Sequence, residues 1–293
     1  MRGAGIPAAA GAALRYLHAS FEKAGVETPD LDARLLVEWA TGANRLAVLA
    51  YPDRLLSVDE RIQLSAALER RLAHEPVHRI IGKRGFYGLD FALSPDTLEP
   101  RPDTECLIDL VLKHSAPRYG APLSVIDLGA GAGIIAITLL CALPNARAVA
   151  TDISAGALAT ASSNAAANGV SARFSAVQGD WLGAAEGRFD LIVSNPPYIA
   201  SRVISALSPE VRKYDPALAL DGGSDGLDAY RSISSSCMSH MNPNGMLAVE
   251  IGFDQRLSVQ RLFEEAGLSL LEAARDLGGN DRALIFHIPS AAK

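Results

Sequence analysis

The pattern of apolar and polar positions divides the chain into a helical first part and a longer second part in which strands and helices alternate. In residues 8–75, apolar side chains recur at intervals of three and four residues, as on one face of a helix. This spacing predicts helices around residues 14–21, from Pro29 to about residue 41, and over residues 58–72. In the last of these helices, three residues are expected to face inward: Ile62, Leu68 and Leu72. We expect residues 1–78 to form a small helical bundle.

Residues 80–94 alternate aromatic and polar side chains around Gly85 and Gly88, a pattern typical of a β-hairpin. We expect this hairpin to form a linker, residues 79–97, between the bundle and the rest of the chain. The prolines of the next segment, residues 98–105, force an extended path. Asp103 or Thr104 is then expected to cap the following helix.

Seven short apolar runs follow, separated by helical stretches and turn residues. We expect a strand in each of them: 125–128, 147–151, 172–177, 190–194, 246–251, 268–273 and 283–288. Strands that alternate with helices are typical of a mostly parallel sheet covered by helices on both faces. The last two strands are joined by a glycine-containing turn at residues 278–281, so they should form an antiparallel pair. The fold predicted for residues 98–293 is therefore α/β and Rossmann-like.

Composition is typical of a globular protein and argues against a long nucleic-acid interface. Of the 293 residues, 49% are hydrophobic and 20% are charged. The net charge is −6, and residues 91–293 carry 15 basic but 22 acidic groups. A surface that binds a long stretch of phosphate backbone needs a positive balance, so we expect no stable nucleic-acid partner.

The cysteine and hydropathy patterns indicate where in the cell the protein works and which kinds of site it lacks. Cys106, Cys141 and Cys237 are far apart and form no CxxC pair, so neither a disulfide framework nor a metal site is indicated. No segment reaches the ~18 apolar residues of a membrane span. Arg15 interrupts the alanine-rich start before a secretory signal is complete. We expect a cytoplasmic protein without metal ions and without membrane association.

A glycine-rich turn follows the first predicted strand. After Asp127 and Leu128 the sequence reads Gly129, Ala130, Gly131, Ala132 and Gly133, and a helix is expected from Ile134. Glycines let the backbone approach a ligand closely, and a helix N-terminus presents unpaired N–H groups. A dinucleotide-binding turn has its third glycine at the sixth position, where this chain has Ile134. A strand that ends in an acidic residue before G-x-G-x-G is instead the pattern of S-adenosylmethionine (AdoMet) sites.

The next two predicted strands end in residues suited to a nucleoside. Asp152 follows the second strand, where its carboxylate could accept hydrogen bonds from ribose hydroxyls or cap the helix from Ser154. Asp180 and Trp181 follow the third strand and place a carboxylate and an indole where an adenine ring would lie. Because ligands bind at the carboxyl ends of parallel strands, we expect these residues to share one site.

The fourth predicted strand stops at Asn195, which is followed by Pro196, Pro197 and Tyr198. Two consecutive prolines cannot continue a sheet ladder. The Asn195 side-chain oxygen and the Pro196 carbonyl are two acceptors that could hold both hydrogens of an NH2 group, and Tyr198 could form a flat wall beside it. The alternative is an ordinary strand followed by a rigid turn, since Asn and Pro are common turn formers.

Together these motifs resemble the HemK/PrmC family, the release-factor glutamine N5-methyltransferases. The resemblance covers most of residues 75–288 and rests on these stretches: RPDTE at 101–105, DLGAGAG at 127–133, Asp152, GDW at 179–181, NPPY at 195–198, VRKYDPALALDGGSDGLDAYR at 211–231 and DLGGNDR at 276–282. It implies that Gly129–Gly133 hold the methionine part of AdoMet, that Asp152 holds the ribose, and that Asp180 and Trp181 hold the adenine.

The same resemblance implies a substrate and a mode of catalysis. Asn195, Pro196, Pro197 and Tyr198 would bind the glutamine of the Gly-Gly-Gln loop in a class I peptide-chain release factor. Asn195, Pro196 and Tyr198 would be the catalytic residues, with Asn195 also next to the cofactor. Residues 1–78 would recognise the protein substrate. No residue stands out as a base.

Two alternatives stay open at this point. The NPPY motif is shared with DNA adenine and some RNA methyltransferases, so the substrate could be an exocyclic amine of a nucleic acid. The acidic balance of residues 91–293 and the short loop after Tyr198 argue against that alternative. The other is a non-catalytic AdoMet-binding scaffold, against which the glycines of 129–133 and the acceptor of Asn195 argue.

Overall fold

The helices predicted for the first part of the chain are present and surround a core of their own. The computed structural model describes residues 5–289. Its first helices are α1 (Ala10–Lys23), α2 (Pro29–Thr41), α3 (Arg45–Ala50), α4 (Val58–Leu72) and α5 (Val77–Ile81). Pro29 occupies the first turn of α2, and Ser57 and Glu60 form a capping box at the start of α4. Large apolar side chains fill the core between these helices, among them Leu17, Phe21, Leu36 and Leu64.

The inward face of α4 differs from the prediction. Ile62 and Leu72 are exposed at 49% and 41%, whereas Leu64 and Arg71 are buried. A helix turns by about 100° per residue, so Ile62 points roughly 200° away from Leu64. The prediction that Ile62 and Leu72 face inward is therefore wrong, while Leu68 is partly buried against the core.

A short helix from far along the chain belongs to the same helical unit. This unit comprises the described residues up to Gly82 together with Pro209–Tyr214, the segment of α10, and the remaining described residues form a second unit, the sheet unit. Within the helical unit, the Arg71 guanidinium is buried between Asp32 and Glu210, at N–O distances of 2.6 and 2.5 Å. The chain therefore passes between the two units three times, after Gly82 and on either side of α10.

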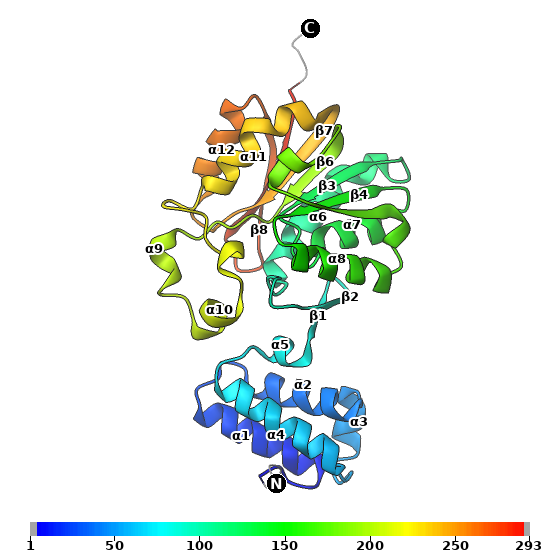
Figure 1. Cartoon of the computed structure of the whole chain (residues 1–293), viewed down its shortest axis with the longest axis vertical. Helices are drawn as coiled ribbons and strands as arrows, with labels where there is room; N and C mark the ends of the chain where they lie inside the picture. The colour runs from blue at the N-terminus through cyan, green and yellow to red at the C-terminus, as the bar shows by residue number, and fades with distance from the viewer. Residues whose placement is uncertain (1–4, 290–293) are drawn as a thin grey trace. The chain divides into compact units, whose positions relative to one another are not determined.

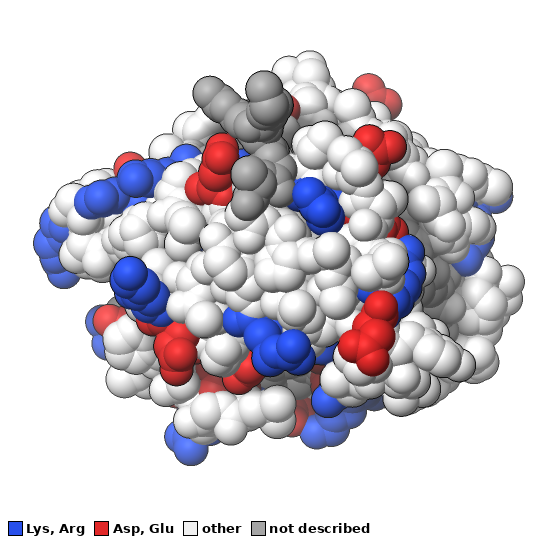
Figure 2. Space-filling view, turned by 90° about the horizontal axis from the view of Figure 1, so that it is seen from below, with Lys and Arg blue, Asp and Glu red and all other residues white. Residues whose placement is uncertain are grey.

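The face seen from below carries charges of both signs. Figure 2 shows Lys and Arg side chains interspersed with Asp and Glu around a broad area of uncharged residues. No continuous basic surface is visible among the described residues of this face.

The predicted hairpin is present and is grouped with the sheet unit. β1 (Lys83–Phe86) and β2 (Leu89–Ala92) pair antiparallel around a two-residue turn. Tyr87 and Gly88 in this turn both have positive φ, 50° and 76°, as a type I′ turn requires. Phe86 and Phe91 pack edge to face in the core of the sheet unit, with ring centroids 6.2 Å apart. The aromatic residues that predict the hairpin therefore also anchor it.

A seven-stranded sheet organises the described part of the second unit, in the order β5-β4-β3-β6-β7-β9-β8. The strands are β3 (Ser124–Leu128), β4 (Arg147–Asp152), β5 (Phe174–Gln178), β6 (Phe189–Ser194), β7 (Met241–Glu250), β8 (Ser269–Arg275) and β9 (Asp281–His287). Strands β3 to β7 pair parallel, and β9 runs antiparallel to both of its neighbours. The mostly parallel sheet with an antiparallel final pair is thus confirmed.

Helices cover both faces of this sheet (Figure 1). One face is covered by α6 (Glu105–Ser115), α7 (Ile134–Ala142) and α8 (Ala155–Ala167), and the other by α11 (Asp228–Ser236) and α12 (Arg256–Glu265). Alternate strand residues point to opposite faces, so Val125 enters the first core and Ile126 the second. This layering brings the carboxyl ends of β3, β4 and β6 to one edge, where the motif residues stand.

The segments between β6 and β7 are less regular than the rest. They include α9 (Ser201–Ile204) and a 3-10 turn at Ala217–Ala219, and α11 ends at Ser236, before the 3-10 turn Cys237–His240. β7 begins directly after this turn, at Met241. Within residues 5–289, none of the helices has the length and apolar character needed to cross a membrane.

Candidate functional site

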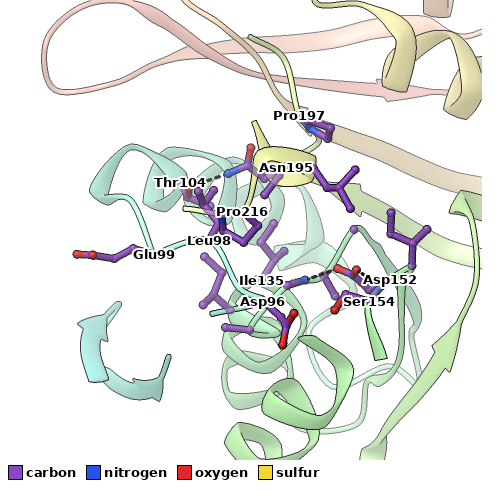
Figure 3. Close-up of a pocket in the computed structure, with 18 of the residues that line it drawn as sticks. Asp96, Leu98, Glu99, Thr104, Ile135, Asp152, Ser154, Asn195, Pro197 and Pro216 are labelled. Atoms are coloured by element: carbon purple, nitrogen blue, oxygen red, sulfur yellow. Dashed lines mark hydrogen bonds between the residues drawn. The ribbon is translucent and has the colours of Figure 1, made fainter. Parts of the chain in front are cut away.

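A cavity lies at the carboxyl ends of β3, β4 and β6, and residues from most of the motifs line it. The lining includes most of the sequence-predicted residues: Gly129, Ala130, Gly131, Ala132, Asp152, Asp180, Trp181, Asn195 and Pro197. Figure 3 shows Asp152 and Ser154 together in one part of the cavity, and Asn195 and Thr104 together in another. The structure thus brings most of the predicted cofactor residues, and Asn195 and Pro197 of the predicted substrate residues, to one cavity.

The glycine-rich turn adopts a backbone that glycine favours. Gly129, Gly131 and Gly133 have φ values of 67°, 54° and 78°, in the left-handed region. A side chain on Gly131 would point into open space, so this part of the backbone is bare toward the cavity. A side chain on Gly133 would approach Ile137 and Ala161 within about 3 Å, and Gly133 does not line the cavity. Gly133 therefore serves the packing of α7 in this structure.

Asp152 holds the turn as well as facing the cavity. Its Oδ2 accepts a hydrogen bond from the Gly131 N–H at 2.9 Å, and its Oδ1 accepts one from the Ser154 N–H at 2.9 Å. The ring of Trp181 lies 3.6 Å from the position of a Gly129 side chain, and Trp181 itself has a positive φ of 46°. A carboxylate, a bare turn and an indole therefore face the same space.

Asn195 is held at the end of β6 by contacts on two sides. The preceding Ser194 donates its hydroxyl to the Leu128 carbonyl at 2.7 Å, which ties the tip of β6 to the tip of β3. The Asn195 Nδ2 donates to the Thr104 hydroxyl oxygen at 3.2 Å. Thr104 was predicted as a possible helix cap, but neither Thr104 nor Asp103 makes a side-chain cap to α6. The capping prediction is therefore wrong, because the Thr104 side chain binds Asn195 instead.

The Tyr198 side chain packs in a core of the sheet unit. Its hydroxyl lies 3.3 Å from Glu250 Oε1, and its ring packs in the core beneath α11 and α12. Tyr198 and Pro196 do not line the cavity in this structure. The predicted flat wall beside the substrate stays a prediction.

The glycines of the 211–231 run meet the NPPY backbone. A side chain on Gly222 would stand 2.7 Å from the Pro197 carbonyl oxygen, and one on Gly226 would stand 2.4 Å from that of Tyr198. Gln255 fastens the same contact by donating to the carbonyls of Tyr198 and Gly226 at 2.9 and 3.1 Å. These close approaches explain why a glycine-rich loop accompanies this motif.

Ion pairs connect the remaining motifs to the site. Arg101, which lines the cavity, pairs with the buried Asp215 at 2.6 Å. Arg282 pairs with Asp276 at 3.0 Å and with Asp103 at 3.5 Å. The RPDTE stretch is therefore tied both to the run after NPPY and to the DLGGNDR turn, three regions far apart in the sequence.

Two fully buried carboxyl groups lie behind the cavity. Burial raises the pKa of Asp127 to about 7, although its Oδ2 accepts a hydrogen bond from the Ala136 N–H at 3.0 Å. Burial likewise raises the pKa of Glu250 to about 7, against the opposing effects of the Thr104 hydroxyl and the Arg282 charge. Both groups therefore change charge near neutral pH.

Several residues of the site were not predicted from the sequence. The cavity is also lined by Asp96, Leu98, Glu99, Thr104, Ile134, Ile135, Ile153, Ser154, Pro216, Leu218 and Ala219. Of the charged residues at the two ends of the RPDTE stretch, Arg101 lines the cavity, whereas Glu105 accepts a hydrogen bond from the Tyr87 N–H at 3.1 Å. A metal site is not evident, since no group of three His, Cys, Asp or Glu residues in the described chain is placed to hold an ion.

Two families of known domains match this chain. Residues 12–82 match the family described as the PrmC N-terminal domain. Residues 104–210 match the family described as the methyltransferase small domain, which contains most of the cavity-lining motifs.

Full-length relatives agree with these matches. The chain is 48% identical over 268 residues to a release factor glutamine methyltransferase of Agrobacterium fabrum, which covers 90% of this chain and 92% of the relative. It is 43% identical over 263 residues to a protein of the same description from Caulobacter vibrioides, covering 89% and 90%. A crystal structure of a methyltransferase from Pyrococcus furiosus shares the fold, with a TM-score of 0.53, 21% identity, and coverage of 70% of this chain and 92% of that one.

Proposed function

Since this chain belongs to the release factor glutamine methyltransferase family, we propose that it transfers a methyl group from AdoMet to the side-chain nitrogen, N5, of a glutamine. The glutamine is the one in the Gly-Gly-Gln motif of class I peptide-chain release factors. The observation that carries this proposal is that Asn195 lines the same cavity as the glycine turn and Asp152. A side chain suited to binding an amide and a sheet edge suited to binding a nucleoside thus line one cavity.

The residues of the cavity fit AdoMet. The bare backbone at Gly131 can approach the methionine part, and each oxygen of Asp152 keeps a lone pair for a ribose hydroxyl beside its backbone hydrogen bond. Trp181 supplies an aromatic surface for the adenine, and Asp180 lies next to it. When bound, AdoMet supplies an electrophilic methyl group.

Asn195 and Pro196 would orient the amide that receives this methyl group. A primary amide nitrogen is a weak nucleophile because its lone pair is delocalised into the carbonyl. Hydrogen bonds from its two hydrogens to Asn195 Oδ1 and the Pro196 carbonyl would fix its position and increase the electron density on nitrogen. Positioning of this kind can contribute about 7–11 kcal/mol to lowering a barrier. The nitrogen would form its new N–C bond as the methyl–sulfur bond breaks, which leaves a neutral thioether, and it would then release to water the proton that the new bond makes acidic.

We propose that the helical unit recognises the release factor. This unit contains the region that matches the PrmC N-terminal domain. None of its described residues lines the cavity that contains the glycine turn. The enzyme would act in the cytoplasm, where release factors work.

The test is methyl transfer from labelled AdoMet to purified class I release factor, compared with DNA and RNA as acceptors. We expect label on the release factor and none on a release factor in which the Gly-Gly-Gln glutamine is replaced by alanine. Label on nucleic acid alone would establish the exocyclic-amine alternative. Binding of AdoMet without transfer to any acceptor would establish the scaffold alternative.

A further inference from the structure

Thr104 is a buried polar residue whose side chain serves Asn195. It is 0% exposed and directly precedes α6, yet it makes no cap to that helix. Its hydroxyl oxygen accepts the hydrogen bond from Asn195 Nδ2, across 91 positions of sequence. Both residues line the cavity, and Figure 3 shows the Asn195 nitrogen turned toward Thr104 and the oxygen turned away from it.

This contact decides which end of the Asn195 amide is available to a substrate. A side-chain amide has a donating NH2 group and an accepting oxygen, and rotation about its last torsion exchanges them at little intrinsic cost. A hydroxyl can accept from an amide NH2 or donate to an amide oxygen, but the Thr104 hydroxyl also faces the Glu250 carboxyl group as a donor. Because its proton is directed to Glu250, it accepts from Asn195 Nδ2, and the amide oxygen is the end left for a ligand. The reversed amide would present two N–H groups to the N–H groups of a substrate amide, and no hydrogen bond could form between them.

Glu250 is a buried carboxyl group next to Thr104 and Tyr198. Its side chain is 1% exposed, Oε1 contacts the Tyr198 hydroxyl, and its backbone carbonyl accepts a hydrogen bond from the Tyr230 hydroxyl at 2.8 Å. The Thr104 hydroxyl is near enough to lower the pKa of Glu250, although Oε2 makes no hydrogen bond of standard geometry to the described residues. Thr104 and Tyr198, on two different motifs, therefore converge on one buried carboxyl group.

We propose that Thr104 is a positioning residue for methyl transfer, which holds the Asn195 amide so that Oδ1 faces the substrate, while Glu250 supports Thr104 and Tyr198 from behind. This inference rests on the proposed function, because it needs Asn195 to accept a hydrogen bond from the substrate amide. Thr104 itself would contact neither the substrate amide nitrogen nor the methyl carbon.

The test compares Thr104→Val, which removes the hydroxyl and keeps the shape, with Thr104→Ser, which keeps the hydroxyl. Single-turnover transfer to a release factor at saturating AdoMet should fall about 10- to 100-fold in the Val variant, as a misplaced polar group predicts. The Ser variant should retain most of the wild-type rate. Thr138→Val is the matched control, because Thr138 is also buried in the sheet unit but its hydroxyl has no partner among the described residues. AdoMet affinity should stay within about twofold in all three variants.

A double-mutant cycle separates positioning from packing. In an Asn195→Ala background, Thr104→Val should cause no further loss of rate, since the side chain that it positions is gone. An equal loss in both backgrounds would overturn the inference, as would a Ser variant as slow as the Val variant.

A measurement that does not depend on enzyme activity tests this inference separately from the proposed function. The side-chain NH2 signals of Asn195 in an NMR spectrum of the full chain can be assigned by their absence in Asn195→Ala. Thr104→Val should shift these signals and speed their exchange with water. Unchanged signals would overturn the inference, whereas a wild-type enzyme that methylates no release factor would contradict only the proposed function.

Discussion

At the scale of single residues, Asn195 is the side chain on which the proposed chemistry depends most. We expect Asn195→Ala to lower the single-turnover rate at least about 100-fold, comparable to removing one preorganised polar contact at a reacting centre. Asn195→Asp keeps an acceptor oxygen but loses the NH2 group that donates to the Thr104 hydroxyl. It should therefore lose less rate, while the added negative charge tightens AdoMet binding in the ground state, which does not help the chemical step. An Ala variant with the wild-type rate would mean that Asn195 is only a strand-ending turn residue.

Asp152 holds the glycine turn and is proposed to bind the ribose of AdoMet. We expect Asp152→Ala to weaken AdoMet binding by about 1.5–3 kcal/mol, because hydrogen bonds to a charged acceptor are lost. Part of this loss comes from the glycine turn, since Asp152 also accepts from the Gly131 N–H. Asp152→Asn keeps one acceptor oxygen and should lose less affinity. Calorimetric titration of the three proteins tests this order, and unchanged affinity in the Ala variant would refute the ribose assignment.

The buried carboxyl group of Glu250 predicts a pH dependence of stability. Its pKa is raised from 4.5 to about 7 in the folded chain, chiefly by burial. Below about pH 4.5 the group is protonated in both the folded and the unfolded state and has no differential effect. As the pH rises toward 7, the unfolded state loses its proton first, so the free energy of unfolding falls, by ~3 kcal/mol for a shift of this size.

Glu250→Gln should remove this pH-dependent fall in the free energy of unfolding. We expect the difference in unfolding free energy, Gln variant minus wild type, to increase between about pH 4.5 and 7 and to be constant below that range. Other titrating groups, including Asp127, are present in both proteins and cancel in the difference. Urea unfolding followed at several pH values measures it, and a difference that does not vary with pH would contradict the prediction.

Sequence motifs predicted most of the cavity but not the residues that support it. The glycine turn, Asp152 and Asn195 are local patterns at the ends of predicted strands, so their convergence follows from the parallel sheet. Thr104 was assigned to a helix start, for which threonine is equally suited. Glu250 stands at the end of an apolar run, and nothing in its neighbours indicates that Tyr198 and Thr104 meet it. Such contacts join residues far apart in sequence and leave no periodic signal.

At the scale of elements, the apolar periodicity correctly predicted most of the helices and strands. It was less accurate for where they begin and end and for which face of a helix is buried. All seven predicted strands are present, but β7 begins five residues earlier than expected, at Met241 rather than Met246. The short helices α9 and α10 were not predicted, because a segment of four to six residues has too few turns to show a repeat. In α4 the inward face was misassigned: Arg71 is buried with its ion-pair partners, whereas Ile62 and Leu72 are exposed.

Asn164 of α8 is expected to be the polar contact that fixes the hairpin against the glycine turn. It is 1% exposed, its Oδ1 accepts from the Ala92 N–H at 2.8 Å, and its Nδ2 donates to the carbonyls of Ala92 and Ala132 at 3.1 and 2.9 Å. Asn164→Leu would leave these backbone groups without their partner. We expect a loss of about 2–4 kcal/mol in unfolding free energy, from one or two unpaired buried groups at roughly 1–3 kcal/mol each.

The neighbouring Ser163 supplies the control for Asn164. Ser163 is exposed and bonds only within its own helix, to the Ala159 carbonyl at 3.0 Å. Ser163→Ala should change the unfolding free energy by less than about 0.5 kcal/mol. If Asn164→Leu is no more destabilising than Ser163→Ala in chemical denaturation, the contact between hairpin and turn does not depend on Asn164.

At the scale of the whole molecule, one segment of the helical unit, α10, comes from a part of the chain that the sequence did not assign to that unit. Residues 209–214 follow the NPPY motif closely in sequence, and the prediction placed them in the methyltransferase domain. In the structure α10 is part of the helical unit, where Tyr214 donates its hydroxyl to the Ala73 carbonyl at 3.1 Å and Glu210 pairs with Arg71. The next residue, Asp215, pairs with Arg101 in the sheet unit, and Pro216 lines the cavity. The chain from Glu210 to Pro216 therefore joins an anchor in one unit to the cavity wall of the other.

We expect Glu210→Gln to loosen this segment at its anchored end. The neutral amide loses the ion pair to Arg71, which retains Asp32, and because Glu210 is 34% exposed the stability cost should be only about 1 kcal/mol. Amide hydrogen exchange of residues 209–216 should nevertheless become at least about fivefold faster, since a local opening costing 1 kcal/mol less is about fivefold more populated. Lys213→Gln, an exposed change of one charge on the same helix, is the control and should leave exchange in this segment unaltered. If both variants exchange like the wild type, the Glu210 ion pair does not hold α10, and the wall residue Pro216 takes its position from the sheet unit alone.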